Sequence, residues 1–113
     1  MKKSVIDRIA RLREKVVGIQ IKLVQIEKAS GYVDEDNFKC YKNEIDRILE
    51  DLEISIIGIE NDVERTYALA EDGWFFGGTG ECEYFVAKEL KEGSHRVNKK
   101  IKQIEDLFSL AVN

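Results

Sequence analysis

The residues of this 113-residue chain that could do chemistry are few and lie far apart in the sequence. His95 is the one histidine, and the two cysteines, Cys40 and Cys82, lack the CxxC spacing of a redox or zinc motif. The glycine-rich string at 77–80 lacks the Lys and Ser/Thr with which a P-loop holds phosphate and Mg²⁺. The acids at 34–36 lack the spacing of a calcium loop. We therefore predict no catalytic residue, no metal site, no cofactor and no enzymatic activity. Both cysteines are expected to be buried as small apolar side chains, with a redox role as the alternative.

The composition is typical of a helical protein. The chain has no proline, 43% hydrophobic, 35% charged and 9% aromatic residues, which excludes collagen-like and disordered chains and predicts an aliphatic core. Its amino terminus is basic, but Asp7 and Arg8 stand where a signal peptide needs an apolar stretch. No window approaches the roughly 20 apolar residues that span a bilayer. We expect a protein without a membrane partner that stays in the cytoplasm or is exported without a cleavable signal peptide.

Three long helices are predicted, over residues 4–29, 34–71 and 80–111, in a single domain that covers residues 1–113. Loop-forming residues interrupt the chain in two places, and apolar residues recur at spacings of three and four within each segment. The predicted fold is all-α, either an elongated helical hairpin or a three-helix antiparallel bundle with coiled-coil-like packing. Gly93 and Ser94 interrupt the third apolar seam, and a kink or break there is the alternative to a continuous helix.

The net charge of −4 is divided unevenly along the chain. Residues 1–30 carry a net charge of +5, residues 31–72 carry −9, and residues 73–113 are neutral overall. The simpler interpretation is that the first two helices pack antiparallel, so that their flanking charges attract one another. Nucleic-acid binding is the alternative, but the bases of the first segment neither share one helix face nor alternate with aromatic residues. We expect no nucleic-acid partner.

The first predicted helix has more apolar residues than one neighbour requires. Ile6, Ala10, Val17, Ile21 and Val24 form a second stripe, most of it about 100–140° around the helix from the seam. Either the third helix of the same chain covers this stripe, or the stripe docks onto another chain. Off-seam isoleucines in the second helix allow the same choice. The excess of apolar surface predicts a binding protein whose partner is another helical protein or a second copy of this chain.

The turn between the second and third helices is rich in aromatic residues. Trp74, Phe75 and Phe76 precede Gly77 and Gly78. Glycines allow a tight reversal, and the indole can close the apolar seam at the tip of the hairpin. Closure of the hairpin explains Trp74, whereas insertion into a partner explains three adjacent aromatic residues. Both interpretations are open at this point.

In its size, its heptads and this turn, the chain resembles the small α-helical proteins of bacterial type VII secretion, namely the WXG superfamily and the small partners of LXG-domain toxins. In the string GWFFGGTGECEYF, Trp74 and Gly77 or Gly78 match the Trp-x-Gly turn, and Phe85 matches a later apolar position. The chain departs from the pattern in the two residues between Trp74 and Gly77 and in its long first helix. Phe85 and Glu89 match a Tyr/Phe-x-x-x-Asp/Glu recognition pair, which here does not lie at the C-terminus.

The resemblance implies a non-enzymatic targeting factor or chaperone that pairs with the helical N-terminal domain of a type VII-secreted LXG toxin. The predicted partner-binding residues are Trp74, Phe75, Phe76, Gly77, Gly78, Phe85, Glu89, Ile6, Val17, Ile21 and Val24. One alternative is an immunity or inhibitor protein whose acidic second helix blocks a basic toxin. The other is a structural coiled-coil adaptor that forms homo-oligomers.

Overall fold

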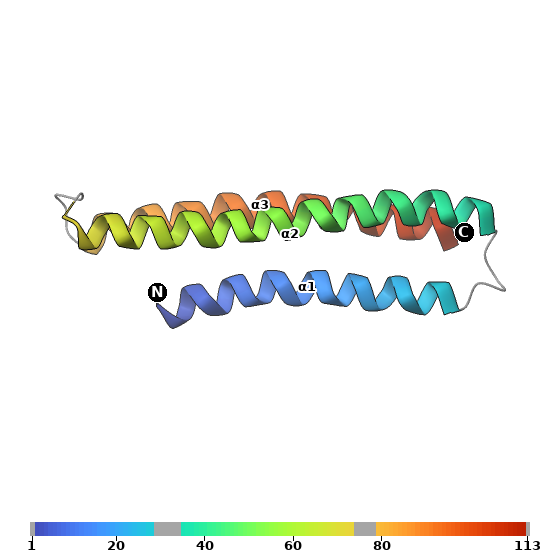
Figure 1. Ribbon diagram of the computed structural model, residues 1–113, viewed down its shortest axis with the longest axis horizontal. Helices are drawn as coiled ribbons and strands as arrows, with labels where there is room; N and C mark the ends of the chain where they lie inside the picture. The colour runs from blue at the N-terminus through green and yellow to red at the C-terminus, as the bar shows by residue number, and fades with distance from the viewer. Residues whose placement is uncertain (1, 29–34, 74–78, 113) are drawn as a thin grey trace.

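The computed structural model describes residues 2–28, 35–73 and 79–112, with side chains at 2–28, 39–73 and 80–110. This part of the chain forms three helices: α1 spans Lys3–Lys28, α2 spans Glu35–Glu71 and α3 spans Thr79–Val112. Each observed boundary lies within one residue of the predicted one. Helices α1 and α3 run in one direction and α2 runs in the other (Figure 1). The prediction of an all-α antiparallel arrangement is confirmed.

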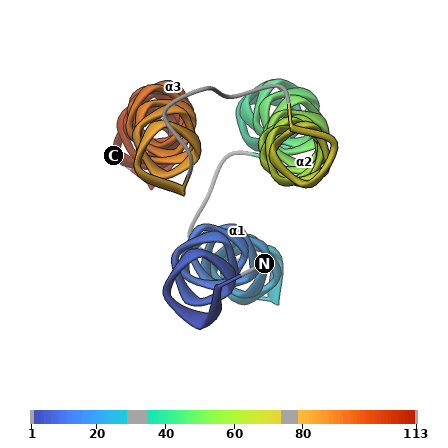
Figure 2. The same cartoon turned by 90° about the vertical axis from the view of Figure 1, so that its left-hand side faces the viewer.

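Viewed along their axes, the three helices occupy the corners of a triangle (Figure 2). The rod measures 60 × 19 × 16 Å, and its radius of gyration of 18.1 Å exceeds the roughly 13 Å of a compact domain of this length. Helix α2 sets the length, because its 37 residues rise about 55 Å. Helices α2 and α3 pack along most of their length, and both extend beyond the start of α1 (Figure 1).

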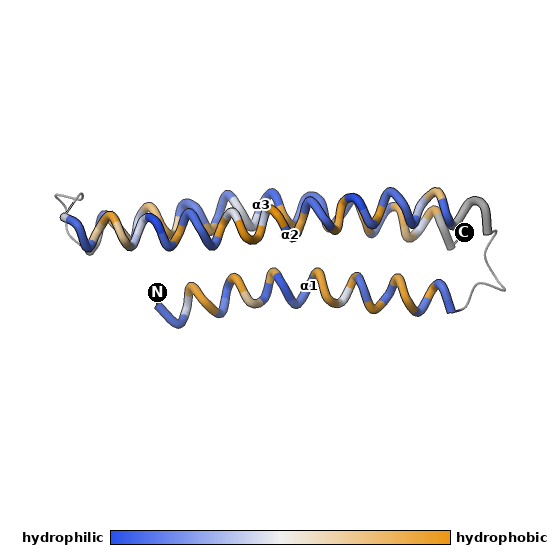
Figure 3. The backbone as a smooth tube through the Cα atoms, viewed as in Figure 1, coloured by the Kyte–Doolittle hydropathy of each residue, from blue (hydrophilic) through white to orange (hydrophobic). Residues whose placement is uncertain are grey.

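One apolar core runs along the axis of the rod and is built from the heptad seams of all three helices. Apolar positions recur along each helix at the spacing that brings them to this axis (Figure 3). Each fully buried aliphatic side chain contributes about 1.5–3 kcal/mol relative to an exposed one. The buried residues are Val5, Ile9, Leu12, Val16, Ile19 and Leu23 of α1, Ile45, Leu49, Leu52, Ile56, Ile59 and Val63 of α2, and Cys82, Val86, Leu90, Val97, Ile101, Ile104 and Phe108 of α3.

Two polar residues interrupt the seam of α2, and each has a partner. Thr66 donates a hydrogen bond from Oγ1 to the carbonyl oxygen of Asp62 over 2.9 Å, which satisfies its hydroxyl within its own helix. Lys42 extends to Glu27 of α1, with 2.5 Å between Nζ and Oε1. This hydrogen bond and the charge of Glu27 raise the pKa of Lys42 above its ordinary value of 10.5. The interruptions therefore leave no unpartnered polar group on the seam.

The turn that follows α2 contains a glycine with a left-handed backbone. Gly73 has a φ of +78°, a conformation that glycine adopts without the steric penalty of a Cβ. Its N–H donates to the carbonyl of Ala70 over 3.1 Å, and the N–H of Asp72 donates to Ala68 over the same distance. These bonds satisfy carbonyl groups that the end of the helix would otherwise leave free.

Helix α3 is continuous through Gly93 and Ser94, so the alternative of a break there is wrong. The seam loses its apolar side chains at this point because Gly93 is itself a buried contact, pressed against Ile59 of α2. Glycine lowers helix propensity, but it is needed where a neighbouring helix occupies the space that a side chain would fill. The gap in the apolar pattern at Gly93 therefore marks a close approach of α3 to α2, not a break in the helix.

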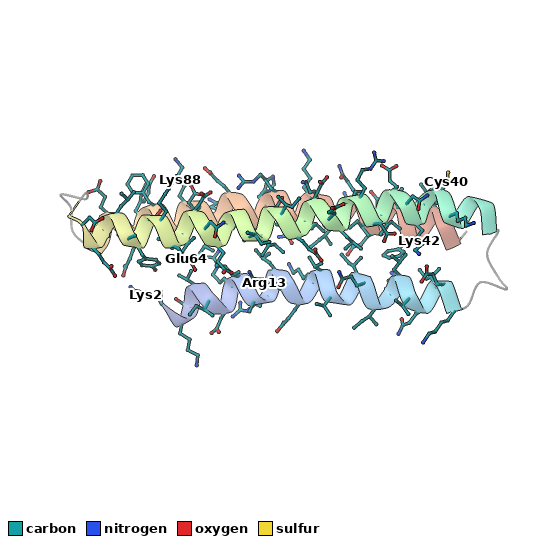
Figure 4. The ribbon with its side chains drawn as sticks, in the orientation of Figure 1. Lys2, Arg13, Cys40, Lys42, Glu64 and Lys88 are labelled. Atoms are coloured by element: carbon teal, nitrogen blue, oxygen red, sulfur yellow. The ribbon has the colours of Figure 1, made fainter. Side chains whose placement is uncertain are left out.

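The uneven charges meet across the helix pairs. Arg13 of α1 pairs with Glu60 of α2, and Lys42 of α2 pairs with Glu27 of α1, so that the two antiparallel helices attract along their flanks (Figure 4). Lys2 pairs with Glu83 of α3. These pairs are partly exposed, and each contributes a few tenths of a kcal/mol. The antiparallel packing is confirmed, but of these two pairs between α1 and α2 only the pair of Arg13 and Glu60 joins the basic segment to the acidic one in the predicted sense, so the attraction between the charge blocks stays a prediction.

Candidate partner-binding surface

The second apolar stripe of α1 is exposed. Ile6, Val17, Ile21 and Val24 are 50%, 50%, 53% and 47% accessible, and Ala10 is half-buried. Of the two alternatives for this stripe, coverage by the third helix of the same chain is therefore wrong. The physical reason is that α2 and α3 both pack against the same face of α1, the one that carries its buried seam. The side of α1 that carries the second stripe lies outside that face and stays exposed.

Helix α2 adds two exposed isoleucines beside this stripe. Ile57 is 53% and Ile54 is 64% accessible. Ile57 and Val17 line the same open groove of about 330 Å³ between α1 and α2. Residues three and four apart share a helix face. Ile54 therefore extends the exposed surface of α2 beyond Ile57, and Ile21 and Val24 extend that of α1 beyond Val17. We name these residues, Val17, Ile21, Val24, Ile54 and Ile57, the apolar face.

Polar pairs cross the groove and hold the two helices in register. Gln20 donates a hydrogen bond from Nε2 to Oε1 of Glu53 over 3.1 Å, and Arg13 bonds to Glu60. Buried Val16 and Ile56 line the groove beneath them. Paired polar groups are thus interspersed with solvent-exposed aliphatic groups along the groove.

The remaining predicted site residues fall into two groups. The aromatic turn, residues 74–78, lies outside the described residues. Phe85 and Glu89 are on α3 and are 37% accessible and half-buried, respectively. Phe85 meets Tyr84 edge to face, with ring centroids 5.5 Å apart. The groove that Val17 lines is formed by α1 and α2 alone. The structure therefore does not bring Phe85 and Glu89 of α3 together with Val17 and Ile21.

The predicted site omitted residues that the structure exposes. Ile54 and Ile57 could have been included, since their position off the seam of the second helix is visible in the heptad spacing. Tyr84, 64% accessible, and Leu110, 58% accessible, carry the same signal, since each lies two residues after a seam position of the third helix. The cysteines differ from each other: Cys82 is buried as predicted, but Cys40 is exposed, so its predicted burial is wrong. Cys40 lies near the start of α2 (Figure 4), two residues before Lys42 on the seam, so the helical period turns it away from the core.

The described residues also bear on metal and membrane binding. They contain no cluster of three or more His, Cys, Asp or Glu that could hold a metal ion. Among the same residues, no helix combines the length and the apolar character needed to cross a membrane. Comparison of the chain with protein-family models, with curated proteins and with solved structures finds no match.

Proposed function

We propose that this chain is a non-enzymatic binding protein whose apolar face receives a helix of another protein. The single observation that carries the proposal is the exposure, at 47–64%, of five large aliphatic side chains on two adjacent helices. Burying the exposed half of each gives about 1 kcal/mol. The gross gain of roughly 5 kcal/mol is available to offset the entropy lost on association.

A helix fits this surface better than an extended segment does. Val17, Ile21 and Val24 follow one another at i, i+4 and i+7, so they form a ridge along α1 that lies beside the groove lined by Ile57. An amphipathic helix with apolar anchors at the same spacing can pack against this ridge. The docked helix would lie along α1 and α2 and extend the bundle to four helices.

For the identity of the partner, we propose the helical N-terminal domain of a type VII-secreted LXG toxin. This step rests on the resemblance of the sequence around Trp74, Gly77 and Phe85 to small type VII secretion proteins. In this role the chain shields apolar faces of the toxin before export and helps to present it to the secretion machine. The exposed aliphatic residues would then belong to a lengthwise interface rather than to a local contact.

One observation favours the immunity-protein alternative. Asp46, Glu50 and Glu53 are all exposed on α2, and Glu53 accepts a hydrogen bond from Gln20. An acidic surface of this kind suits a basic toxin. The two proposals differ in which variants matter: neutralisation would require Asp46 and Glu50, whereas targeting would require the apolar face.

The test is co-expression of the chain with the products of adjacent genes, followed by measurement of complex stoichiometry and affinity. The double variant Ile21→Glu/Ile57→Glu should weaken binding about 100-fold, because it removes two apolar contacts and places charges in the interface. Leu110→Glu is the matched control, since Leu110 is equally exposed but lies on α3. It should leave binding unchanged.

The outcome discriminates among the candidate functions. A one-to-one complex that the double variant loses and the control keeps supports the proposal. Loss of binding in Asp46→Asn/Glu50→Gln, with the double variant unaffected, would favour the immunity protein. A symmetric homo-oligomer that binds no adjacent gene product would favour the structural adaptor. Each apolar substitution removes a side chain that is about half buried and should cost about 1 kcal/mol in stability, whereas the substitutions of exposed acids should cost less than about 0.5 kcal/mol.

A further inference from the structure

A second surface lies on the opposite flank of α1, where α1 and α3 run side by side. An open hollow of about 450 Å³ lies between α1 and α3, and a second of about 920 Å³ lies mainly on α3, with Arg8 as its residue from α1; Asn98 lines both. The larger takes Arg8 from α1 and Lys88, Lys91 and Arg96 from α3. The smaller includes Lys15, Lys22 and Lys102. We name these seven bases and the two hollows the basic groove.

The charge of the basic groove is opposite to that of the chain. Glu92 and Glu105 are the acids that line it, against its seven Lys or Arg, whereas the chain as a whole has a net charge of −4. This concentration arises on folding. Arg8, Lys15 and Lys22 are spaced by seven residues and so share one flank of α1; Lys102 of α3 lines the same hollow as Lys15 and Lys22, and Lys88, Lys91 and Arg96 line the other hollow with Arg8. The sequence-based expectation that the bases of the first segment share no helix face is therefore wrong for these three.

Much of this charge is unneutralised. Arg8, Lys88, Lys91 and Arg96 form no ion pair with any residue that the structure describes. Lys15 donates a hydrogen bond to Oδ1 of Asn98 over 2.9 Å, and a cation–π contact places Nζ of Lys22 4.9 Å from the ring centroid of Phe108. Like charges held close together repel, and an anionic partner relieves this repulsion.

We infer that the basic groove binds an acidic amphipathic helix of another protein. Between Arg8 and Lys22, α1 rises about 21 Å, which corresponds to four turns of a docked helix with one acidic residue per heptad opposite each base. Gly18 opens the lining of the smaller hollow, since a Cβ built there would have no atom within 4 Å. Ile101 and Phe108 give that hollow an apolar wall. Charge along the rim and apolar atoms below are what an amphipathic helix requires.

The groove suits a helix better than a nucleic acid. Proteins that read duplex DNA insert a helix or a β-ribbon into its major groove, whereas these seven bases line hollows on the flank of a helix pair. Single strands bind through exposed aromatic platforms on which successive bases stack. Here Phe108 is 3% accessible, and the exposed rings in the lining, Tyr84 and His95, lie 11 positions apart on α3 and form no continuous stacking platform. The inference is independent of the proposed function, because it concerns a different flank of α1 and a different chemistry.

The test uses the full chain and two synthetic 21-residue helical peptides. One carries Glu along one flank and Leu and Ala toward the groove, and the other has Gln in place of each Glu. Fluorescence anisotropy at 50 mM and 300 mM salt should show the Glu peptide binding at least about tenfold more tightly at low salt, with the advantage shrinking at high salt. Equal affinity of the two peptides would overturn the proposal.

Two charge-matched double variants locate the binding. Arg8→Glu/Lys91→Glu changes the groove, while Lys28→Glu/Lys39→Glu makes the same change of net charge at exposed bases outside it. Circular dichroism should show both folded. The groove variant should lose the preference for the Glu peptide, and the control should keep it. Ile21→Glu/Ile57→Glu should also keep it, which separates this result from failure of the apolar face.

Three outcomes would contradict the inference. If both charge variants lose the preference equally, the peptide responds to net charge and not to the groove. If a 20-nucleotide oligothymidine binds more tightly than the Glu peptide and shows the same variant dependence, the occupant is a single-stranded nucleic acid. If the free chain self-associates and the groove variant alone abolishes this, the occupant is a second copy.

Discussion

Gly93 of α3 packs directly against Ile59 of α2: a Cβ placed on Gly93 would lie 2.5 Å from both Cδ1 and Cγ1 of the isoleucine. Real Cβ atoms do not approach another carbon so closely. Ile59 is 2% accessible and has little space into which to move. The absence of a side chain at position 93 therefore allows the two long helices to approach each other closely at this level of the bundle.

Gly93→Ala should destabilise the protein. Alanine improves helix propensity by about 1 kcal/mol, but overpacking against Ile59 costs about 1–3 kcal/mol, so we expect a net loss near 1 kcal/mol in the free energy of unfolding by urea. In the double variant Gly93→Ala/Ile59→Ala the clash is absent, and the two losses should be less than additive.

Gly18→Ala and Gly58→Ala are the matched controls. Both glycines lie inside helices, with open space where a Cβ would be. Each substitution should stabilise the protein by about 0.5–1 kcal/mol. Equal stabilisation by all three alanine variants would contradict the close approach at Gly93.

The two thiols should react at very different rates. Cys40 is exposed, whereas Cys82 is 3% accessible, with its Sγ 3.9 Å from the carbonyl oxygen of Thr66. A thiol reagent should label Cys40 at once and Cys82 only when α2 and α3 separate. Mass spectrometry of the labelled native protein should find one modification, and urea should release the second. Rapid double labelling in native buffer would show that α3 does not pack as described.

The pKa of Lys42 depends on Glu27 across the α1/α2 interface. Because the pKa is raised in the folded state, the pair stabilises the protein fully below pH 10.5, and this contribution is lost as the pH rises through the higher folded value. In Glu27→Gln the pKa of Lys42 should fall toward 10.5. An NMR titration of the Lys42 side chain in both proteins measures the difference. Identical midpoints would mean that the pair does not form.

Helix α1 should open before α2 and α3 do. It packs less extensively against α2 and α3 than these two helices pack against each other. Its second apolar stripe is also exposed. We therefore expect native-state hydrogen exchange to be at least tenfold faster for amides around Leu12 than for those around Leu52 and Ile104, which are among the most buried core residues. Equal protection throughout would indicate one cooperative unit with α1 fully integrated.

Most of the fold follows from local spacing. The alternation of three and four residues from Val5 to Leu23 identifies the buried face of α1 without knowledge of its neighbours, because a helix buries the stripe that repeats at its own period. The long helices follow in the same way from the absence of proline and the rarity of turn residues.

The candidate sites depend on tertiary placement, which local spacing does not specify. The spacing of Val17 and Ile21 identifies a second stripe but does not say whether α3 covers it. The bases Arg8 and Lys91 are 83 positions apart in the sequence and are brought to one groove by the bundle. Gly93 shows the same limit, since a glycine within a heptad pattern is compatible with both a kink and a close contact.

The central claim, that the apolar face receives a helix of another protein, is tested most directly by photo-crosslinking in the native host. A photoreactive phenylalanine derivative at Ile21, in the apolar face, is compared with the same group at Leu110, which is similarly exposed on α3. We predict that position 21 yields a single major adduct, identified by mass spectrometry as the helical N-terminal domain of an adjacent LXG toxin, and that position 110 yields none of it. Equal adducts at both positions, or none from position 21 other than with a second copy of this chain, would contradict the claim.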